Sequence, residues 1–105
     1  MSVIVDVIQE EYNRLEALLK EYEDKIRSYP QGSLQLRMRG SQGYYYLSYR
    51  DKADNRVKDI YIGKESSEKV EEYKKDIAER RKYVQRKKQV ENSLRELRKL
   101  LRVTR

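Results

Sequence analysis

The hydrophobic period of the chain changes twice, and this change constrains the fold more than any other feature. Up to Tyr29 the apolar residues recur every three or four positions, as on one face of a helix. Between residues 33 and 62 they alternate with polar residues, as in strands with one covered face. From residue 66 the helical spacing returns. The pattern predicts an α+β fold in which two long helices flank a three-stranded antiparallel meander.

The first helix is predicted over residues 3–29. Ser2 is a suitable N-cap, and Pro30 followed by Gly32 is expected to end the helix. The β-branched residues of the VIVDVI segment could equally begin a strand. We interpret this segment as helical because its isoleucines extend the apolar stripe. That stripe consists of Ile4, Ile8, Tyr12, Leu15, Leu19, Tyr22, Ile26 and Tyr29.

The meander is predicted over residues 33–63, with turns at residues 40–43 and 51–56 and with Gly63 at its end. Neighbouring side chains of a strand point to opposite faces. One face therefore collects apolar residues, which we expect to turn toward the helices: Leu34, Leu36, Met38, Tyr45, Leu47, Tyr49, Ile60 and Ile62. The opposite face collects Gln35, Arg37, Arg39, Tyr44, Tyr46, Ser48, Arg50, Asp59 and Tyr61.

The second helix is predicted over residues 66–103, with Ser66 as its N-cap. Its apolar stripe is Val70, Tyr73, Ile77, Val84, Val90, Leu94, Leu97 and Leu101, with Arg80 and Lys87 at two positions where an apolar residue is expected. We predict that residues 1–105 form one domain, in which the helices pair as an antiparallel hairpin of coiled-coil type with Ile26 opposite Val70.

That register would leave the end of the second helix without a partner. Leu94, Leu97 and Leu101 would lie beyond the first helix, and large apolar stripes are usually covered. We therefore predict a homodimer whose interface is formed by Leu94, Leu97 and Leu101, with a frayed tail as the alternative.

The composition argues against several classes of function. The chain has 105 residues and contains neither cysteine nor histidine, which removes thiolate nucleophiles and the commonest metal ligands. We expect no metal and no cofactor. The sequence has no glycine-rich phosphate loop, and no nucleophile lies beside a base, so we expect a protein without enzymatic activity. No apolar run reaches the roughly 20 residues that span a bilayer. We expect a cytoplasmic protein without a membrane partner.

The charge is strongly basic and unevenly distributed. The net charge is +7 and the calculated isoelectric point is about 9.6, which favours anionic partners. Residues 1–29 carry four basic and seven acidic side chains, whereas residues 65–105 carry fourteen and eight. The acidic first helix could neutralise part of the second by pairing between helices. The excess positive charge must still face solvent or a polyanion.

Two basic features are candidates for binding nucleic acid, DNA more than RNA. On the polar sheet face, arginine can bind phosphate with two hydrogen bonds and tyrosine can stack on bases. On the second helix, residues 80–88 read RRKYVQRKK, without an acid. The predicted binding residues are Arg37, Arg39, Tyr44, Tyr46, Arg50, Tyr61, Arg80, Arg81, Lys82, Arg86, Lys87 and Lys88.

Each feature also has a simpler interpretation. Tyrosine and arginine form stabilising cross-strand pairs on ordinary exposed sheets. A basic helical run is often only a solvated face. The alternative function is therefore a structural or protein–protein interaction module, in which the exposed stripe from Leu94 to Leu101 docks another protein.

The central segment carries a resemblance. The string PQGSLQLRMRGSQGYYYLSYR, followed by VKDIYIGK, resembles a family of small uncharacterised prokaryotic proteins with a GSL start, a YYYLxYR strand, a YIGK strand end and a long charged helix. It is also similar to the N-terminal β-region of some transposases and, more loosely, to arm-type DNA-binding domains of phage integrases. The resemblance implies association with DNA in a mobile-element or regulatory setting and implies no catalytic residues. The residues that carry it are Tyr44, Tyr45, Tyr46, Leu47, Tyr49, Arg50, Tyr61, Ile62, Gly63 and Lys64.

Overall fold

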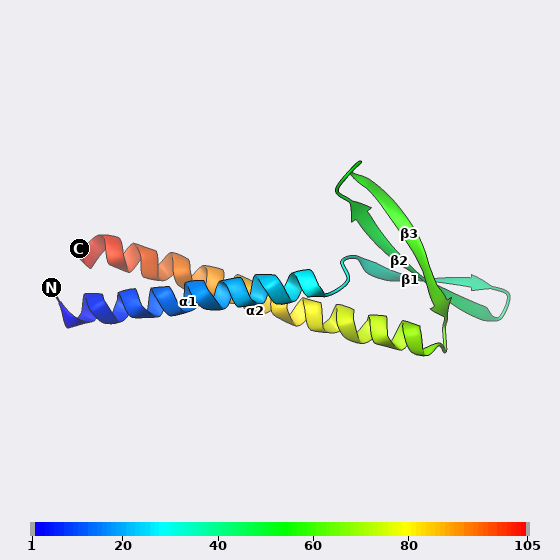
Figure 1. Cartoon of the computed structure of the whole chain (residues 1–105), viewed down its shortest axis with the longest axis horizontal. Helices are drawn as coiled ribbons and strands as arrows, with labels where there is room; N and C mark the ends of the chain where they lie inside the picture. The colour runs from blue at the N-terminus through cyan, green and yellow to red at the C-terminus, as the bar shows by residue number, and fades with distance from the viewer. Residues whose placement is uncertain (1, 105) are drawn as a thin grey trace. The chain divides into compact units, whose positions relative to one another are not determined.

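The protein consists of two long helices with a three-stranded antiparallel sheet between them in the chain. The computed structural model describes residues 2–104. In chain order the elements are α1 (Val3–Ser28), β1 (Ser33–Arg39), β2 (Gln42–Asp51), β3 (Arg56–Lys64) and α2 (Glu68–Thr104), as Figure 1 shows. The predicted α+β class and the predicted order of elements are confirmed.

The helix ends lie within a few residues of the predicted positions. The backbone N–H of Ile4 donates to the Ser2 hydroxyl oxygen at 3.1 Å, which makes Ser2 the N-cap of α1. The VIVDVI segment is helical from Val3 onward. The prediction of Ser66 as the cap of α2 was wrong by one residue. The Ser67 hydroxyl accepts from the backbone N–H of Val70 at 3.3 Å, and α2 begins at the next residue, Glu68.

The sheet has the strand order β1-β2-β3, with antiparallel neighbours throughout. Leu34 pairs with Leu47, which pairs in turn with Ile60. Residues paired in this way lie on the same face of a sheet. The register therefore confirms the predicted division into an apolar face and a polar face. A β-bulge beside Tyr45 and Tyr46 shifts the register of β3 by one residue.

Two glycines allow the chain to enter and turn within the sheet. Gly32, just before β1, has a φ of 115°, and a Cβ atom there would collide with the carbonyl oxygen of Ser48. Gly40 has a φ of 60° in the two-residue turn between Arg39 and Gln42. Positive φ values of this kind are costly for residues that carry a Cβ atom.

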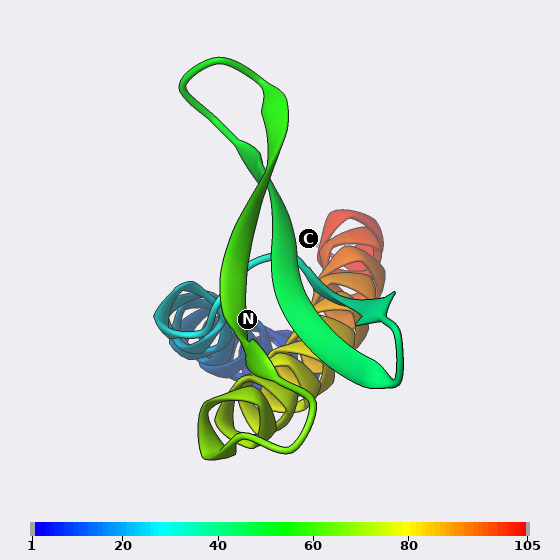
Figure 2. The same ribbon diagram turned by 90° about the vertical axis from the view of Figure 1, so that its right-hand side faces the viewer.

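The chain divides into two compact units, each with its own apolar core. One unit, here called the helical unit, comprises the residues up to Ser28 and those from Arg81 onward. The other, here called the sheet unit, is Tyr29–Arg80 and contains the strands and the first part of α2. Figure 2, which is turned by 90° from Figure 1, shows β2 and β3 as a strongly twisted ribbon.

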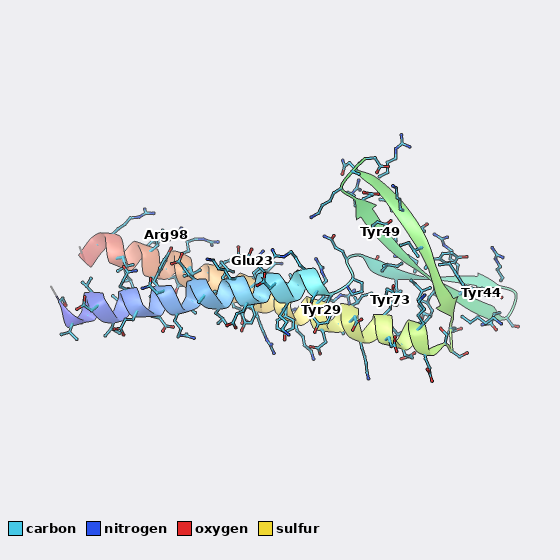
Figure 3. The ribbon with its side chains drawn as sticks, viewed as in Figure 1. Glu23, Tyr29, Tyr44, Tyr49, Tyr73 and Arg98 are labelled. Atoms are coloured by element: carbon cyan, nitrogen blue, oxygen red, sulfur yellow. The ribbon has the colours of Figure 1, made fainter. Side chains whose placement is uncertain are left out.

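The core of the sheet unit forms where α2 packs on the apolar face of the strands. Val70 is fully buried, and Tyr73 lies on the side of α2 that faces the strands, as Figure 3 shows. The core consists of Leu47, Ile62, Val70 and Ile77, with Leu34, Tyr45 and Tyr73 packed against it.

The apolar face of the sheet is covered only in part. We expected Leu36, Met38 and Ile60 to turn toward the helices, but they are 45%, 56% and 47% exposed. These residues lie on the edge strands β1 and β3. One helix about 10 Å wide covers little more than the central strand of a sheet whose strands lie about 4.8 Å apart.

The helical unit pairs α1 with the later part of α2 in antiparallel orientation. The Tyr22 and Tyr83 rings lie 5.8 Å apart between centroids, and the Arg98 guanidinium donates to the Tyr12 hydroxyl at 3.0 Å. The core consists of Leu15, Val90 and Leu94, with Tyr12, Leu18, Leu19, Tyr22 and Leu97 packed against it.

The predicted register, with Ile26 opposite Val70, was wrong. The sheet occupies the first turns of α2, because Val70 and Ile77 belong to the core of the sheet unit. The partner of α1 therefore begins near Tyr83, and α1 runs beside the last turns of α2 (Figure 1).

Candidate nucleic-acid interface

Three tyrosines form a continuous aromatic group on the polar face of the sheet. Tyr44 and Tyr46 come from β2, and Tyr61 comes from β3. The Tyr61 ring centroid lies 5.5 Å from that of Tyr46 and 6.3 Å from that of Tyr44, both in tilted or edge contacts typical of aromatic pairs. Tyr61 is half exposed, at 50%. The ring of Tyr45, by contrast, packs in the core on the other face.

Arg37 lies over this aromatic group and is held by an acid. Its guanidinium carbon is 4.4 Å from the centre of the Tyr46 ring, and its Nη2 atom is 2.6 Å from Oδ2 of Asp59. Hydrogen bonds from Arg37 and then from Ser48 hold the pKa of the Asp59 carboxyl below its ordinary value. Asp59 therefore remains ionised at neutral pH and offsets part of the positive charge of the face.

Arg39 and Lys64 supply cations at the end of the face near Tyr44. The guanidinium carbon of Arg39 lies 5.9 Å from the centre of the Tyr44 ring. Lys64 pairs with Tyr44 in the register between β2 and β3 and is exposed. Lys64 was missed by the sequence analysis, because strict alternation from Ile60 and Ile62 would put it on the apolar face. The β-bulge reverses its direction, and the adjacent Gly63 was the only signal for it.

Arg50 stabilises a turn in addition to lying on the polar face. Its Nη1 atom donates to the carbonyl oxygen of Asn55 at 2.8 Å, across the turn between β2 and β3. The same turn is held by Asp51, whose carboxylate accepts from the backbone of Ala53 at 2.9 Å and from Lys58 at 2.6 Å. Lys58 and the Ala53 N–H together lower the pKa of Asp51. Replacement of Arg50 would therefore disturb the hairpin as well as any ligand contact.

The basic run at residues 80–88 does not form one surface. Nine residues wind through about two and a half turns of a helix, so their side chains point in all directions. Arg80 and Lys87 are half buried, and Nε of Arg80 is buried without a hydrogen-bond partner among the described residues. Arg86 lies 5.3 Å from the centre of the Tyr83 ring and lines a hollow between α1 and α2. Arg81, Lys82 and Lys88 are exposed.

The leucines that we assigned to a dimer interface pack inside one chain. Leu94 is 5% exposed in the core of the helical unit, Leu101 is 7% exposed, and Leu97 packs against the same core. The reason is the register of α1, which covers this part of α2. The surface that was expected to bind a second copy or another protein is therefore already covered, and association of copies stays a prediction without that support.

Comparison with known proteins places the chain in a family. A family model described as a domain of unknown function, DUF6788, matches residues 8–72, which is more than half of the chain. The chain belongs to this family, in agreement with the predicted resemblance to an uncharacterised family. No curated protein and no solved structure matches the chain.

The described part of the chain contains neither a membrane-spanning helix nor a metal-binding cluster of acidic residues. Neither α1 nor α2 contains an apolar stretch that could cross a bilayer. Within residues 2–104, acidic side chains form no cluster of three or more that could hold a metal ion.

Proposed function

We propose that the protein is a non-enzymatic nucleic-acid-binding protein, with DNA as the first ligand to test. The polar face of the sheet binds the ligand. Its bases stack on the tyrosine group formed by Tyr44, Tyr46 and Tyr61, and its phosphates contact Arg39 and Lys64. The observation that carries this proposal is the contact of all three rings within one exposed face bordered by cations.

The chemistry of the face favours unpaired bases over an intact duplex. Stacking on an aromatic side chain needs an accessible ring, and Tyr61 is the most exposed residue of the group. Base stacking is sequence tolerant, because every base has an aromatic face. Four cations of the face, Arg37, Arg39, Arg50 and Lys64, outnumber its one acid, Asp59.

Arg37 supports the face without being its strongest phosphate contact. Its charge is compensated by Asp59, and its guanidinium already covers the Tyr46 ring. Arg39 and Lys64 are therefore better placed than Arg37 to contact phosphate. Tyr61 is better placed than Tyr46 to stack on a base.

The proposal is tested by fluorescence anisotropy with labelled single-stranded and duplex DNA. The variant R39Q/Y61A should lose at least about tenfold in affinity for the single strand, since stacking alone is worth about 1–3 kcal/mol for each base. The variant Y61F should retain most of the affinity, because it keeps the ring.

Arg56 provides a matched control. It is exposed, and its register partner Asp51 places it on the opposite face of the same sheet. R56Q removes the same charge as R39Q and should change the affinity by less than about twofold. Equal losses in R39Q and R56Q, or unchanged binding in R39Q/Y61A, would contradict the assignment of this face.

A further inference from the structure

The exposed cations of the helical unit follow a heptad spacing along α2. Arg81, Lys88, Arg95, Lys99 and Arg102 are all exposed, and each occupies one line of positions that repeats every four and then three residues. Gln85 and Asn92 occupy the two remaining positions of this line. We call these seven positions the cationic stripe. It contains no acidic and no apolar residue.

The cationic stripe lies on the side of α2 opposite its core. The inner stripe of α2 runs through Tyr83, Lys87, Val90, Leu94, Leu97 and Leu101, which are buried or partly buried. Each of the first six members of the cationic stripe lies two residues before one of these positions. Two residues correspond to about 200° around a helix. The seven positions extend over about 32 Å of helix, at about 1.5 Å for each residue. The contiguous run at residues 80–88 contains only three of them.

The composition of the stripe favours a partner that carries phosphate groups. A partner helix in a coiled coil requires apolar residues at the positions that repeat every three and four residues. Here these positions hold only cations and amides, and ion pairs between exposed side chains stabilise an interface by little. Phosphate groups need no apolar contact, and arginine, lysine, glutamine and asparagine side chains all donate hydrogen bonds to phosphate oxygens. A phosphodiester backbone fits the stripe, whereas an acidic helix does not.

We propose that the cationic stripe is a second nucleic-acid contact, which holds the phosphate backbone along the outer side of α2. This inference rests on the proposed function and adds a sequence-independent contact to the stacking face. The stripe lies outside residues 8–72, which the family model matches. The Nη1 atom of Arg95 donates to Oδ1 of Asn92 at 3.3 Å, so neighbouring members of the stripe can orient one another.

The test compares two triple variants of the full chain that lose the same charge. K88Q/R95Q/K99Q removes three cations of the stripe. K20Q/K69Q/K75Q removes three exposed lysines that lie off the stripe. Glutamine has nearly the helix propensity of lysine and arginine, so both variants should keep the far-ultraviolet circular dichroism of the wild type. The probe is a labelled single-stranded oligonucleotide of about 30 nucleotides, long enough to reach more than one contact.

The measured quantity is the slope of log affinity against log salt concentration. Loss of three phosphate contacts should reduce the slope by about 2 for the stripe variant, since each phosphate contributes about 0.7 with single strands. The control variant should reduce it by less than about 0.5. Equal slopes in the two variants would overturn the assignment of the cationic stripe as a phosphate contact. The loss of affinity in R39Q/Y61A would still support binding by the polar face of the sheet.

The other outcomes are also decisive. If the wild type binds no oligonucleotide, the proposed function and this inference are both wrong. If the stripe variant loses binding to polyglutamate while its oligonucleotide slope matches the control, the stripe binds acidic protein segments, and the assignment to nucleic acid is overturned.

Discussion

Side chains that share a face recur every two residues in the sheet unit and about every 3.6 residues in the helical unit. A charge pattern in the sequence therefore predicts a charged surface only when its spacing matches the element that carries it. In the sheet unit, residues two positions apart share a face. Tyr44, Tyr46 and Arg50 of the YYYLSYR strand therefore lie on the polar face, whereas Tyr45, Leu47 and Tyr49 lie on the apolar face. In the helical unit, adjacent cations point about 100° apart. The RRKYVQRKK run therefore scatters around α2, while cations seven residues apart line up.

The two units also build their cores differently. The sheet unit buries residues from strands and helix around Val70, which is fully buried. The helical unit buries only a narrow stripe between two helices, with Leu15, Val90 and Leu94 at its centre. The following variants test this comparison, beginning with the largest expected effect.

Truncation of one core residue in each unit should destabilise the protein strongly. L94A in the helical unit and I77A in the sheet unit should each lower the free energy of unfolding by about 2–5 kcal/mol. Urea denaturation followed by circular dichroism measures the change. The L94A effect should be the same at low and high protein concentration, because α1 of the same chain covers Leu94. A loss that depends on concentration would instead support the predicted dimer.

Glycine replacement in the sheet unit should have the next largest effect. G32A places alanine at a position with a positive φ and brings its Cβ atom against the Ser48 carbonyl oxygen. This change should lower the free energy of unfolding by more than about 2 kcal/mol. G40A has the same φ problem but open space around it, and should cost about 1 kcal/mol. Thermal or urea unfolding compares the two. A G40A loss equal to that of G32A would contradict the close approach of the chain at Gly32.

Removal of the only acid on the polar sheet face should tighten nucleic-acid binding. D59N frees the guanidinium of Arg37 and removes a carboxylate that repels phosphate. We expect affinity for single-stranded DNA to rise roughly two- to fivefold, as for the loss of one exposed charge interaction. Anisotropy titration at low salt measures it. D54N, in the turn of the same hairpin, is the control and should leave the affinity nearly unchanged.

The smallest expected effect concerns the titration of Asp59. Its pKa is lowered in the folded protein, so its interaction with Arg37 stabilises the fold above the ordinary carboxyl pKa and is lost as pH falls through the folded value. R37Q should raise the pKa of Asp59 toward its ordinary value. Carboxyl chemical shifts followed by NMR between about pH 2 and 7 measure the change. An unchanged pKa would mean that Arg37 and Asp59 are not paired in solution.

Much of the fold could be predicted from the sequence, because both periods are local signals. The order of elements, the strand pairing and the two faces of the sheet follow from the spacing of apolar residues. The register between the helices could not be predicted, because it depends on a competition for the same apolar stripe. Val70, Tyr73 and Val90 all belong to the same apolar stripe of α2 in the sequence. The first two pack against the sheet, whereas Val90 packs against α1.

The candidate site was predicted in part for the same reason. Tyr44, Tyr46 and Tyr61 were placed on one face by alternation alone, and the structure brings their rings together. Lys64 was missed because a β-bulge interrupts the alternation of side chains, and no periodic pattern in the sequence marks its position. The salt bridge between Arg37 and Asp59 joins residues far apart in the sequence, so no local pattern identifies it.

Amide and tyrosine-ring NMR shifts during titration with single-stranded DNA test the central claim most directly. The proposed function predicts that the largest shifts fall on the polar face of the sheet, at Tyr44, Tyr46, Tyr61 and their neighbours Arg39 and Lys64. Shifts at Tyr45 and in the core around Val70 should stay small. A spectrum that does not change with excess DNA, or that changes only on the apolar face, would contradict the account.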